Sequence, residues 1–273
     1  MKNLTEYKNK IINKLRPNLK EAILELEMKN ICDDEKIAVF DLDNTLINGD
    51  IGDSLYCYLK STGHEFDYKW SDYQAMLARK DYQNSYCDII TTMKGLNIST
   101  VYNAAKHLIS TNSEIICFSE DGIEYEFPVP TPIPEMQILV TYLKISGWKV
   151  GVISASYHIA VKAVCESLFN LNPQFIRGVR TEIEVTEKYE DLITDIIKGT
   201  VTYRQGKADV FQELFGEGVK PLISAGDSHG DIELLNLTSQ NGLIILCGKS
   251  LSNINFLKSK IESNAKFVDF QVS

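Results

Sequence analysis

The chain has 273 residues, 44% of them hydrophobic and 24% charged, and its formal net charge is −9. This composition is typical of a folded globular protein and excludes an intrinsically disordered chain. An acidic chain without a dense Lys/Arg run also disfavours nucleic acid and anionic membranes as partners. The length predicts one large domain, or a main domain with a smaller insertion.

The first 35 residues predict a helical segment that packs on the rest of the protein. Residues 4–30 read as two helices separated near Pro17, and residues 19–26 place apolar side chains on one face of the second helix. Charges interrupt the whole segment, so it predicts neither a signal peptide nor a membrane span. The six cysteines lack metal-ligand spacing and indicate reduced thiols. We therefore expect a cytoplasmic protein.

Four short apolar runs predict strands: residues 37–40 (IAVF), 149–153 (KVGVI), 221–225 (PLISA) and 243–247 (LIILC). Unbroken apolar runs of this length suit a parallel sheet that is covered on both faces. Small or acidic polar residues follow the first three runs, and the carboxyl ends of parallel strands meet at one edge. The sequence thus predicts an α/β fold with a Rossmann-like parallel sheet, helices on both faces, and polar groups gathered at one edge.

The segment between the first two strands has a different character. Residues 53–59, 68–80, 85–94 and 100–110 predict helices, and residues 117–127 predict a hairpin turning at 120–122. A proline-rich stretch, FPVPTPIP, then predicts a stiff return connection. We interpret residues 51–130 as an inserted, mostly helical cap, and residues 36–50 with 131–273 as the α/β core.

Two aspartate pairs carry the strongest chemical signal. Asp41 and Asp43 directly follow the first strand in the sequence DLDNT. One carboxylate at such a site can attack phosphorus while the other transfers a proton. Close carboxylates repel each other, so a cation between them is expected. Asp227 and Asp231, in GDSHGD after the third strand, add oxygen ligands of the kind that Mg²⁺ prefers.

Two further residues are ambiguous when taken alone. Ser154 follows the second strand and precedes a predicted helix over 157–168, where a hydroxyl and free amides can bind an anion or can simply cap the helix. Lys207 opens a predicted helix over 208–214, where its charge opposes the helix dipole. A nearby anion would justify Lys207, although a surface lysine is the simpler interpretation.

Taken in order, DxDxT, a strand-end serine, a lysine and GDxxxD resemble the haloacid dehalogenase superfamily over about residues 36–250. The resemblance is greatest to the phosphoserine phosphatase-like branch, whose helical C1-type cap is inserted after the first motif. It implies a phosphatase with Asp41 as nucleophile and Asp43 as general acid/base. It also implies that Lys207 neutralises developing charge, and that phosphate is held by Ser154, the amide of Ala155 and Thr45.

The same resemblance implies a Mg²⁺ cofactor. Asp41, the backbone carbonyl of Asp43 and Asp227 would bind the ion, and Asp231 would order a water molecule or Lys207. The implied partner is a small phosphorylated metabolite. All the motif residues needed for catalysis are present, which disfavours a non-catalytic protein that only binds a phosphorylated ligand.

The substrate is predicted from the cap. Asp50 occupies the place where the branch has an acidic residue that meets the amine of the substrate. Ile89 aligns with the branch's carboxylate-binding arginine, and Arg79 lies a turn or more too early to replace it without a shift. This favours phosphocholine or phosphoethanolamine over phosphoserine. Four tyrosines could offer cation–π faces or could simply pack the cap: Tyr56, Tyr58, Tyr82 and Tyr86.

The sequence leaves several alternatives open. A protein phosphatase or a phosphotransferase could use the same motifs, because an aspartyl-phosphate can pass to an alcohol as well as to water. The physiological substrate and the oligomeric state are not predicted.

Overall fold

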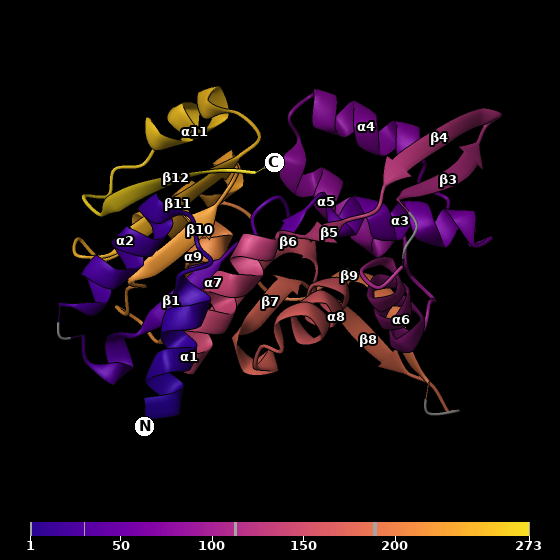
Figure 1. Ribbon diagram of the computed structural model, residues 1–273. Coiled ribbons are helices and arrows are strands. Elements are labelled where there is room, and N and C mark those ends of the chain that lie inside the picture. Colours follow the sequence, from indigo (N-terminus) through magenta and orange to yellow (C-terminus); the bar gives the residue numbers. More distant parts are fainter. Residues whose placement is uncertain (1, 30, 112–113, 188–189, 273) are drawn as a thin grey trace.

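The computed structural model describes residues 2–29, 31–111, 114–187 and 190–272. Its main feature is a six-stranded parallel sheet in the order β12-β11-β10-β1-β6-β7 (Figure 1). The strands are β1 (Ile37–Phe40), β6 (Lys149–Tyr157), β7 (Ile176–Val179), β10 (Ile223–Gly226), β11 (Leu243–Gly248) and β12 (Lys266–Gln271). The predicted parallel α/β sheet is confirmed.

Helices cover both faces of this sheet because the side chains of each strand alternate between the faces. Ala38 and Phe40 of β1 pack into the cluster that includes α2 (Pro17–Glu27), α7 (Pro134–Ile145) and α8 (His158–Phe169). Ile37 and Val39 pack on the opposite side, against α9 (Gln205–Phe215) and α10 (Ile232–Asn236). With α11 (Leu251–Lys258) beside β11 and β12, the sheet is buried as its apolar runs predict.

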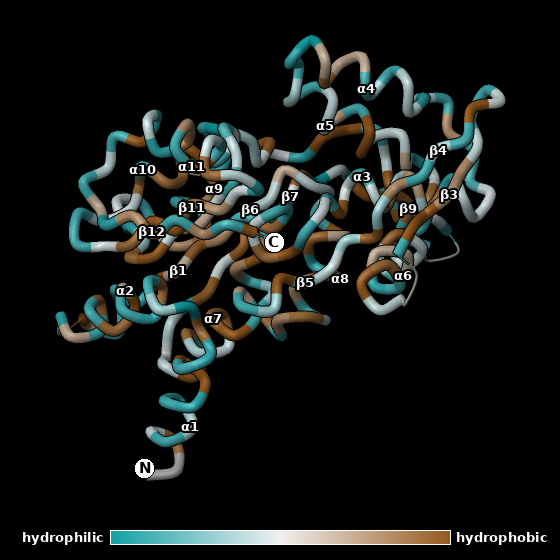
Figure 2. The backbone as a smooth tube through the Cα atoms, turned by 45° about the horizontal axis from the view of Figure 1, so that its top comes forward, coloured by the Kyte–Doolittle hydropathy of each residue, from teal (hydrophilic) through white to brown (hydrophobic). Residues whose placement is uncertain are grey.

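The N-terminal segment forms the two expected helices, α1 (Lys2–Ile12) and α2 (Pro17–Glu27), and Pro17 is the first residue of the second. The buried residues of α2 are those predicted: Leu19, Ala22, Ile23 and Leu26. The backbone amide and side chain of Arg16 both donate to Glu135 at the start of α7. The segment therefore packs on the sheet's helical layer, while the start of α1 reaches away from it (Figure 2).

Residues 51–130 form the predicted helices and hairpin. The elements are α3 (Ile51–Ser61), α4 (Trp70–Ala78), α5 (Tyr82–Thr91), α6 (Ile98–Leu108), β3 (Ile115–Glu120) and β4 (Ile123–Pro128). The short strands β2 (Ile47–Asn48) and β5 (Thr131–Pro132) pair antiparallel where the chain leaves and returns. All these elements lie to one side of the sheet's carboxyl edge in Figure 1. Their treatment as a separate cap stays a prediction.

A second hairpin was missed by the sequence analysis. It consists of β8 (Thr181–Val185) and β9 (Asp191–Ile197), which pair antiparallel. The amide of Gly95 donates to the carbonyl of Ile193 at 2.8 Å, and the amide of Ile193 donates to Leu96 at 2.9 Å. The hairpin therefore joins the helical segment at the α5–α6 turn. Short 3₁₀ turns at Asp33–Glu35, Pro173–Phe175 and His229–Asp231 complete the described secondary structure.

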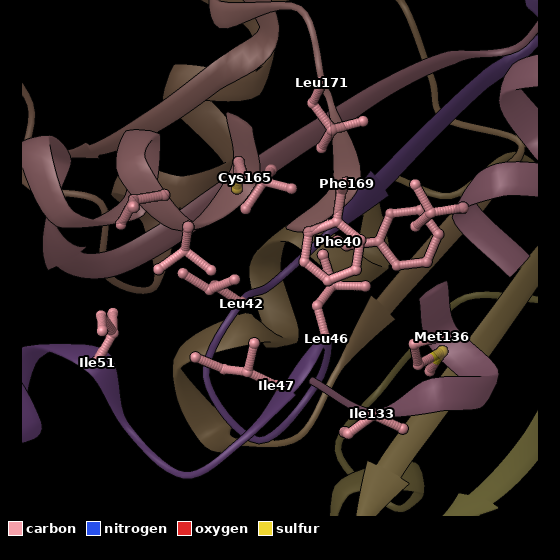
Figure 3. Packing of buried hydrophobic residues seen from close by; sticks show 14 of the residues in the cluster. Phe40, Leu42, Leu46, Ile47, Ile51, Ile133, Met136, Cys165, Phe169 and Leu171 are labelled. Carbon is pink, nitrogen blue, oxygen red and sulfur yellow. The ribbon is translucent and has the colours of Figure 1, made fainter. Parts of the chain in front are cut away.

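No helix in the described ranges combines the length and apolar character that a membrane crossing requires. The buried core is instead continuous beneath the first motif (Figure 3). There Phe40, Leu42, Leu46 and Ile47 have no exposed surface and pack near Met136. Because Leu42 and Leu46 anchor the loop in the core, the intervening polar residues 43–45 are fixed relative to β1.

Candidate active site

The loop after β1 places Asp41 and Asp43 at the carboxyl edge of the sheet. The amide of Asp41 donates to the carbonyl of Ala225 in β10, which extends the ladder to the first catalytic candidate. Leu42, between the aspartates, points into the core with no exposed surface. Asn44 has a left-handed backbone, with φ of 54°, and its amide donates to Gly49. This turn brings both carboxylates to one cavity.

Lys207 lies at the centre of the site rather than on the surface. Its ammonium donates to Asp41 Oδ1 and to Asp231 Oδ1, each at 2.5 Å, and only 3% of its side chain is exposed. Burial lowers the pKa of Lys207, but the carboxylates of Asp231 and Asp41 outweigh this and raise the pKa above its usual value. The carboxylates of Asp41 and Asp231 are therefore the nearby anions expected beside a lysine in the first turn of α9.

Asp231 has both carboxylate oxygens engaged. Oδ1 accepts from Lys207, while Oδ2 accepts from the amides of Asp227 and Ser228 at 3.2 and 3.0 Å and from the Ser228 hydroxyl. These contacts fit the expectation that Asp231 orders Lys207. Carboxylate oxygens of Asp41, Asp227 and Asp231 lie within 4.8 Å of one another. Burial, and then the neighbouring Asp231 and Asp41, raise the pKa of Asp227 well above its usual value.

Asp43 is held by three donors. Its Oδ2 accepts from the hydroxyls of Ser154 at 3.0 Å and Ser156 at 2.8 Å, and its Oδ1 accepts from the amide of Ile51 at 2.7 Å. Burial raises the pKa of Asp43 to about 7, and the charge of Asp50 adds to the rise, whereas these three hydrogen bonds lower it. A carboxyl group that titrates near neutral pH suits general acid/base catalysis.

Two predicted phosphate-binding residues do not line the cavity. β6 continues through Tyr157, so Ser154 lies inside the strand, fully buried, and its hydroxyl is used by Asp43 and by the amide of Ser156. Thr45 is also fully buried, and its hydroxyl has no hydrogen-bond partner among the described residues. Ala155 and Ser156 form the wall instead. Ser156 was overlooked, although it follows Ser154 at the spacing that a strand requires to face the same side.

The cavity has a volume of about 110 Å³ and is strongly acidic. Of the described residues that line it, five are aspartates (Asp41, Asp43, Asp50, Asp53 and Asp227) and one, Lys207, is cationic. Asp53 is a lining residue that the sequence motifs did not predict. Asp50 caps α3 by accepting from the amide of Asp53, which places both carboxylates on the first turn of one helix. Burial, with the charge of Asp53 adding to it, raises the pKa of Asp50 to about 8.

The rest of the wall is aromatic and apolar. Tyr86 lines the cavity, as do Tyr73 and Tyr203, which the sequence did not single out. Tyr73 donates its hydroxyl to Asp53 Oδ1 at 2.6 Å. The other three tyrosines considered from the sequence pack elsewhere: Tyr56 against Trp70, Tyr58 against His107 and Tyr82 against Tyr203.

The wall lacks the guanidinium that a substrate carboxylate would require. Ile89, which the resemblance aligns with the branch's arginine, lines the cavity. Arg79 ends α4 and is not part of the wall. Within the described part of the chain, the end of the cavity away from Lys207 therefore offers carboxylates and rings, and no positive charge.

Comparison with known proteins agrees with this geometry. The model of the haloacid dehalogenase-like hydrolase family matches residues 38–236, which is most of the chain and spans all four motifs. The chain belongs to this family. Its resemblance to the superfamily is thus confirmed.

Two curated relatives of this haloacid dehalogenase-like hydrolase are phosphatases. A histidinol-phosphatase from Neisseria meningitidis is 28% identical over 212 residues, covering 76% of this chain and 88% of the relative. A phosphoserine phosphatase from Methanocaldococcus jannaschii is 21% identical over 220 residues, covering 80% and 88%. Together with the family match, these relatives support the assignment of this hydrolase as a phosphatase.

Solved structures show the same fold at low identity. A protein of unknown function from Anaerococcus prevotii superposes with a TM-score of 0.61 at 16% identity, covering 90% of each chain. A substrate-bound phosphoserine phosphatase superposes with a TM-score of 0.52 at 19% identity, covering 85% of this chain and 92% of the other. The α/β sheet with its helical insertion is thus the fold of phosphoserine phosphatase-like proteins.

Proposed function

We propose that this protein is a Mg²⁺-dependent phosphatase that hydrolyses the phosphate monoester of a small amine-bearing metabolite through an aspartyl-phosphate on Asp41. The observation that carries the proposal is the cavity itself. It joins five aspartates to one buried lysine and has no second cation on its described wall. Its small volume favours a compact ester over a phosphorylated protein as the substrate. Two alternatives remain: a protein phosphatase, and a phosphotransferase that passes the phosphoryl group to an alcohol.

The chemistry follows from the positions of the side chains. The free carboxylate oxygen of Asp41 attacks phosphorus, and the bond from phosphorus to the ester oxygen breaks. Asp43 donates a proton to the leaving alkoxide and then accepts a proton from the water that hydrolyses the acyl phosphate. Lys207, fixed between Asp41 and Asp231, offsets negative charge on the transferring phosphoryl group.

The donor set fits a magnesium ion. Oxygen ligands from Asp41, Asp227 and the backbone carbonyl of Asp43 would hold Mg²⁺, and the close, buried carboxylates of Asp41 and Asp227 would be stabilised by its charge. When bound, Mg²⁺ neutralises phosphate oxygens and favours the deprotonated nucleophile. Asp231 contributes by orientation, because both of its oxygens already accept hydrogen bonds.

The proposed amine site consists of Asp50 and Asp53. Both lie on the cavity wall with Tyr86. An ammonium group would offset the burial and the neighbouring carboxylate charges that raise their pKa values. Phosphocholine and phosphoethanolamine match this site better than phosphoserine, because no described cation faces a substrate carboxylate. Histidinol phosphate, the ester named by the Neisseria relative, shares the amine, lacks the carboxylate and is a further candidate.

The decisive experiment is phosphate release from a panel of esters with Mg²⁺. The panel contains phosphocholine, phosphoethanolamine, histidinol phosphate, phosphoserine and 4-nitrophenyl phosphate. We expect an amine-bearing ester without a carboxylate to be preferred, and Asp41→Asn to reduce kcat roughly a thousandfold or more. Absence of turnover on every ester, or full activity of Asp41→Asn, would contradict the proposal.

Asp50→Asn tests the amine site separately. We expect it to raise KM for the preferred amine ester roughly tenfold, since a charge-assisted contact is lost, and to raise it less for 4-nitrophenyl phosphate, which has no amine. Asp72→Asn, at an exposed position of α4, is the matched control. Equal effects of Asp50→Asn on both esters would exclude Asp50 from amine recognition.

A further inference from the structure

A second cavity lies beside the catalytic one and has the opposite charge. It has a volume of about 360 Å³ and lies between α6, α8 and the missed hairpin β8–β9, elements that lie side by side in Figure 1. Its described lining contains no carboxylate but four basic side chains, His158, Lys162, Arg180 and Lys198. A positively charged cavity is unexpected on a protein with a net charge of −9.

Arg180 is the central observation. It follows β7, is only partly exposed, and forms no salt bridge with any carboxylate in the described part of the chain. Two other cations have carboxylate neighbours that do not line the cavity: Lys162 lies 4.0 Å from Glu166, and Lys198 lies 3.1 Å from Glu182. Both pairs are exposed enough to contribute little energy. An unpaired, half-buried guanidinium among other cations is costly without an anion.

His158 reports the same positive field. Its Nδ1 accepts from the amide of Gly178, so the ring carries its proton on Nε2 when neutral. Burial, together with the charges of Arg177, Arg180 and Lys162, lowers its pKa to about 4. The imidazole is therefore neutral at physiological pH, and the permanent positive charge of the cavity comes from Arg180 and the two lysines.

Apart from Thr181, the remaining described wall is apolar or aromatic. It includes Ile98 and Tyr102 of α6, Ile159 of α8, and Ile183 of β8. Tyr157 lines both this cavity and the catalytic one, and its hydroxyl is hydrogen-bonded to Thr181 at 2.9 Å. Tyr157 therefore belongs to the walls of both cavities. A ligand here would need a compact negative group for Arg180 and a flat or apolar body for the rest.

We propose that the cavity between α6, α8 and β8 is a second binding site, specific for a small organic anion that carries a phosphate-like dianion on an apolar body. The three permanent cations would bind the dianion, with the guanidinium of Arg180 contacting two of its oxygens. The site is distinct from the catalytic cavity, whose five carboxylates repel anions when no metal ion is bound.

Phenylphosphonate is a suitable probe, because its carbon–phosphorus bond resists a monoester phosphatase. We would titrate it by isothermal calorimetry into the protein in EDTA, so that the acidic catalytic cavity cannot retain it through Mg²⁺. Saturable binding is expected, and the uncharged analogue benzyl alcohol is expected not to bind. Absence of binding by phenylphosphonate, or equal binding by both compounds, would overturn the proposal.

Two variants locate the site. Arg180→Gln should weaken phenylphosphonate binding roughly tenfold or more, as expected for the loss of a charge-assisted hydrogen bond. Lys162→Gln should also weaken phenylphosphonate binding. The Lys162 side chain is partly exposed and can be replaced without opening the core. This variant therefore tests the site even if Arg180→Gln is poorly folded. Lys106→Gln, at an exposed position of α6 outside the cavity, should bind as the native protein does. Unchanged affinity in the folded Arg180 and Lys162 variants would exclude this cavity as the site.

Discussion

At the scale of single residues, Ser156 has the most instructive position. Its hydroxyl donates to Asp43, and this hydrogen bond lowers the pKa of a carboxyl group that burial has raised to about 7. In the proposed mechanism Asp43 must be protonated to serve the leaving group, so the upper limb of the pH profile should report its pKa. Ser156 would then adjust the pKa of the proposed proton donor without contacting phosphorus.

We predict that Ser156→Ala moves the upper limb of the kcat–pH profile to higher pH. The carboxylate form of Asp43 loses a donor, so its pKa rises and the protonated acid persists further into the alkaline range. The profile, measured with saturating Mg²⁺ and the preferred ester, should shift by a fraction of a pH unit, with less than about a tenfold loss of kcat at the optimum. A shift to lower pH would show that the hydrogen bond does not stabilise the carboxylate form.

The residues of the site were predictable to the extent that they depend on strand ends. Asp41, Asp43 and Asp227 follow strands directly, so the motif alone places them at the sheet edge. Ser154 was placed beyond its strand, whereas β6 continues past it and buries the hydroxyl. Asp53 could not be inferred until the start of α3 was known, because the cap at Asp50 sets which face of the helix enters the cavity.

At the scale of elements, the hairpin β8–β9 is the largest omission of the sequence analysis. In β8 (TEIEV) acidic residues alternate with Ile183 and Val185, and most residues of both strands are at least partly exposed. Unbroken apolar runs identify buried parallel strands, whereas an exposed ribbon such as this hairpin lacks them. Only the tertiary contact of Ile193 with the α5–α6 turn shows that the ribbon supports the helical segment.

We predict that Ile193→Ala lowers the free energy of unfolding by about 2–4 kcal/mol, because Ile193 is 1% exposed and its truncation leaves a cavity in the main core. Ile196→Ala, on the same strand but 60% exposed, should change it by less than about 0.5 kcal/mol. Denaturant titration of both variants measures the difference. Equal stability of the two would show that the hairpin does not belong to the cooperative core.

At the scale of the whole molecule, the acidic cavity links stability to pH and metal. Burial raises the pKa of Asp41, Asp43 and Asp53 to about 7 and that of Asp50 to about 8, each above its usual value near 4. Between about pH 4 and pH 8 the folded, metal-free protein therefore binds more protons than the unfolded chain. These groups lower its stability as the pH rises through that window.

Mg²⁺ should reverse this loss, because it binds the deprotonated carboxylates. We predict that a hundredfold excess of Mg²⁺ over its Kd raises Tm by roughly 5–10 °C at about pH 8, and that the same concentration has a smaller effect at about pH 5.5, where protons compete for the carboxylates. Calorimetric melts in EDTA and in MgCl₂ measure the difference. Asp227→Asn should lose most of the increment, whereas Asp72→Asn, with an exposed carboxylate, should keep it. An increment that is independent of pH, or that survives in Asp227→Asn, would place the ion elsewhere. The pairing of Asp41 and Asp231 with the buried Lys207 would then need another explanation than metal-assisted phosphoryl transfer.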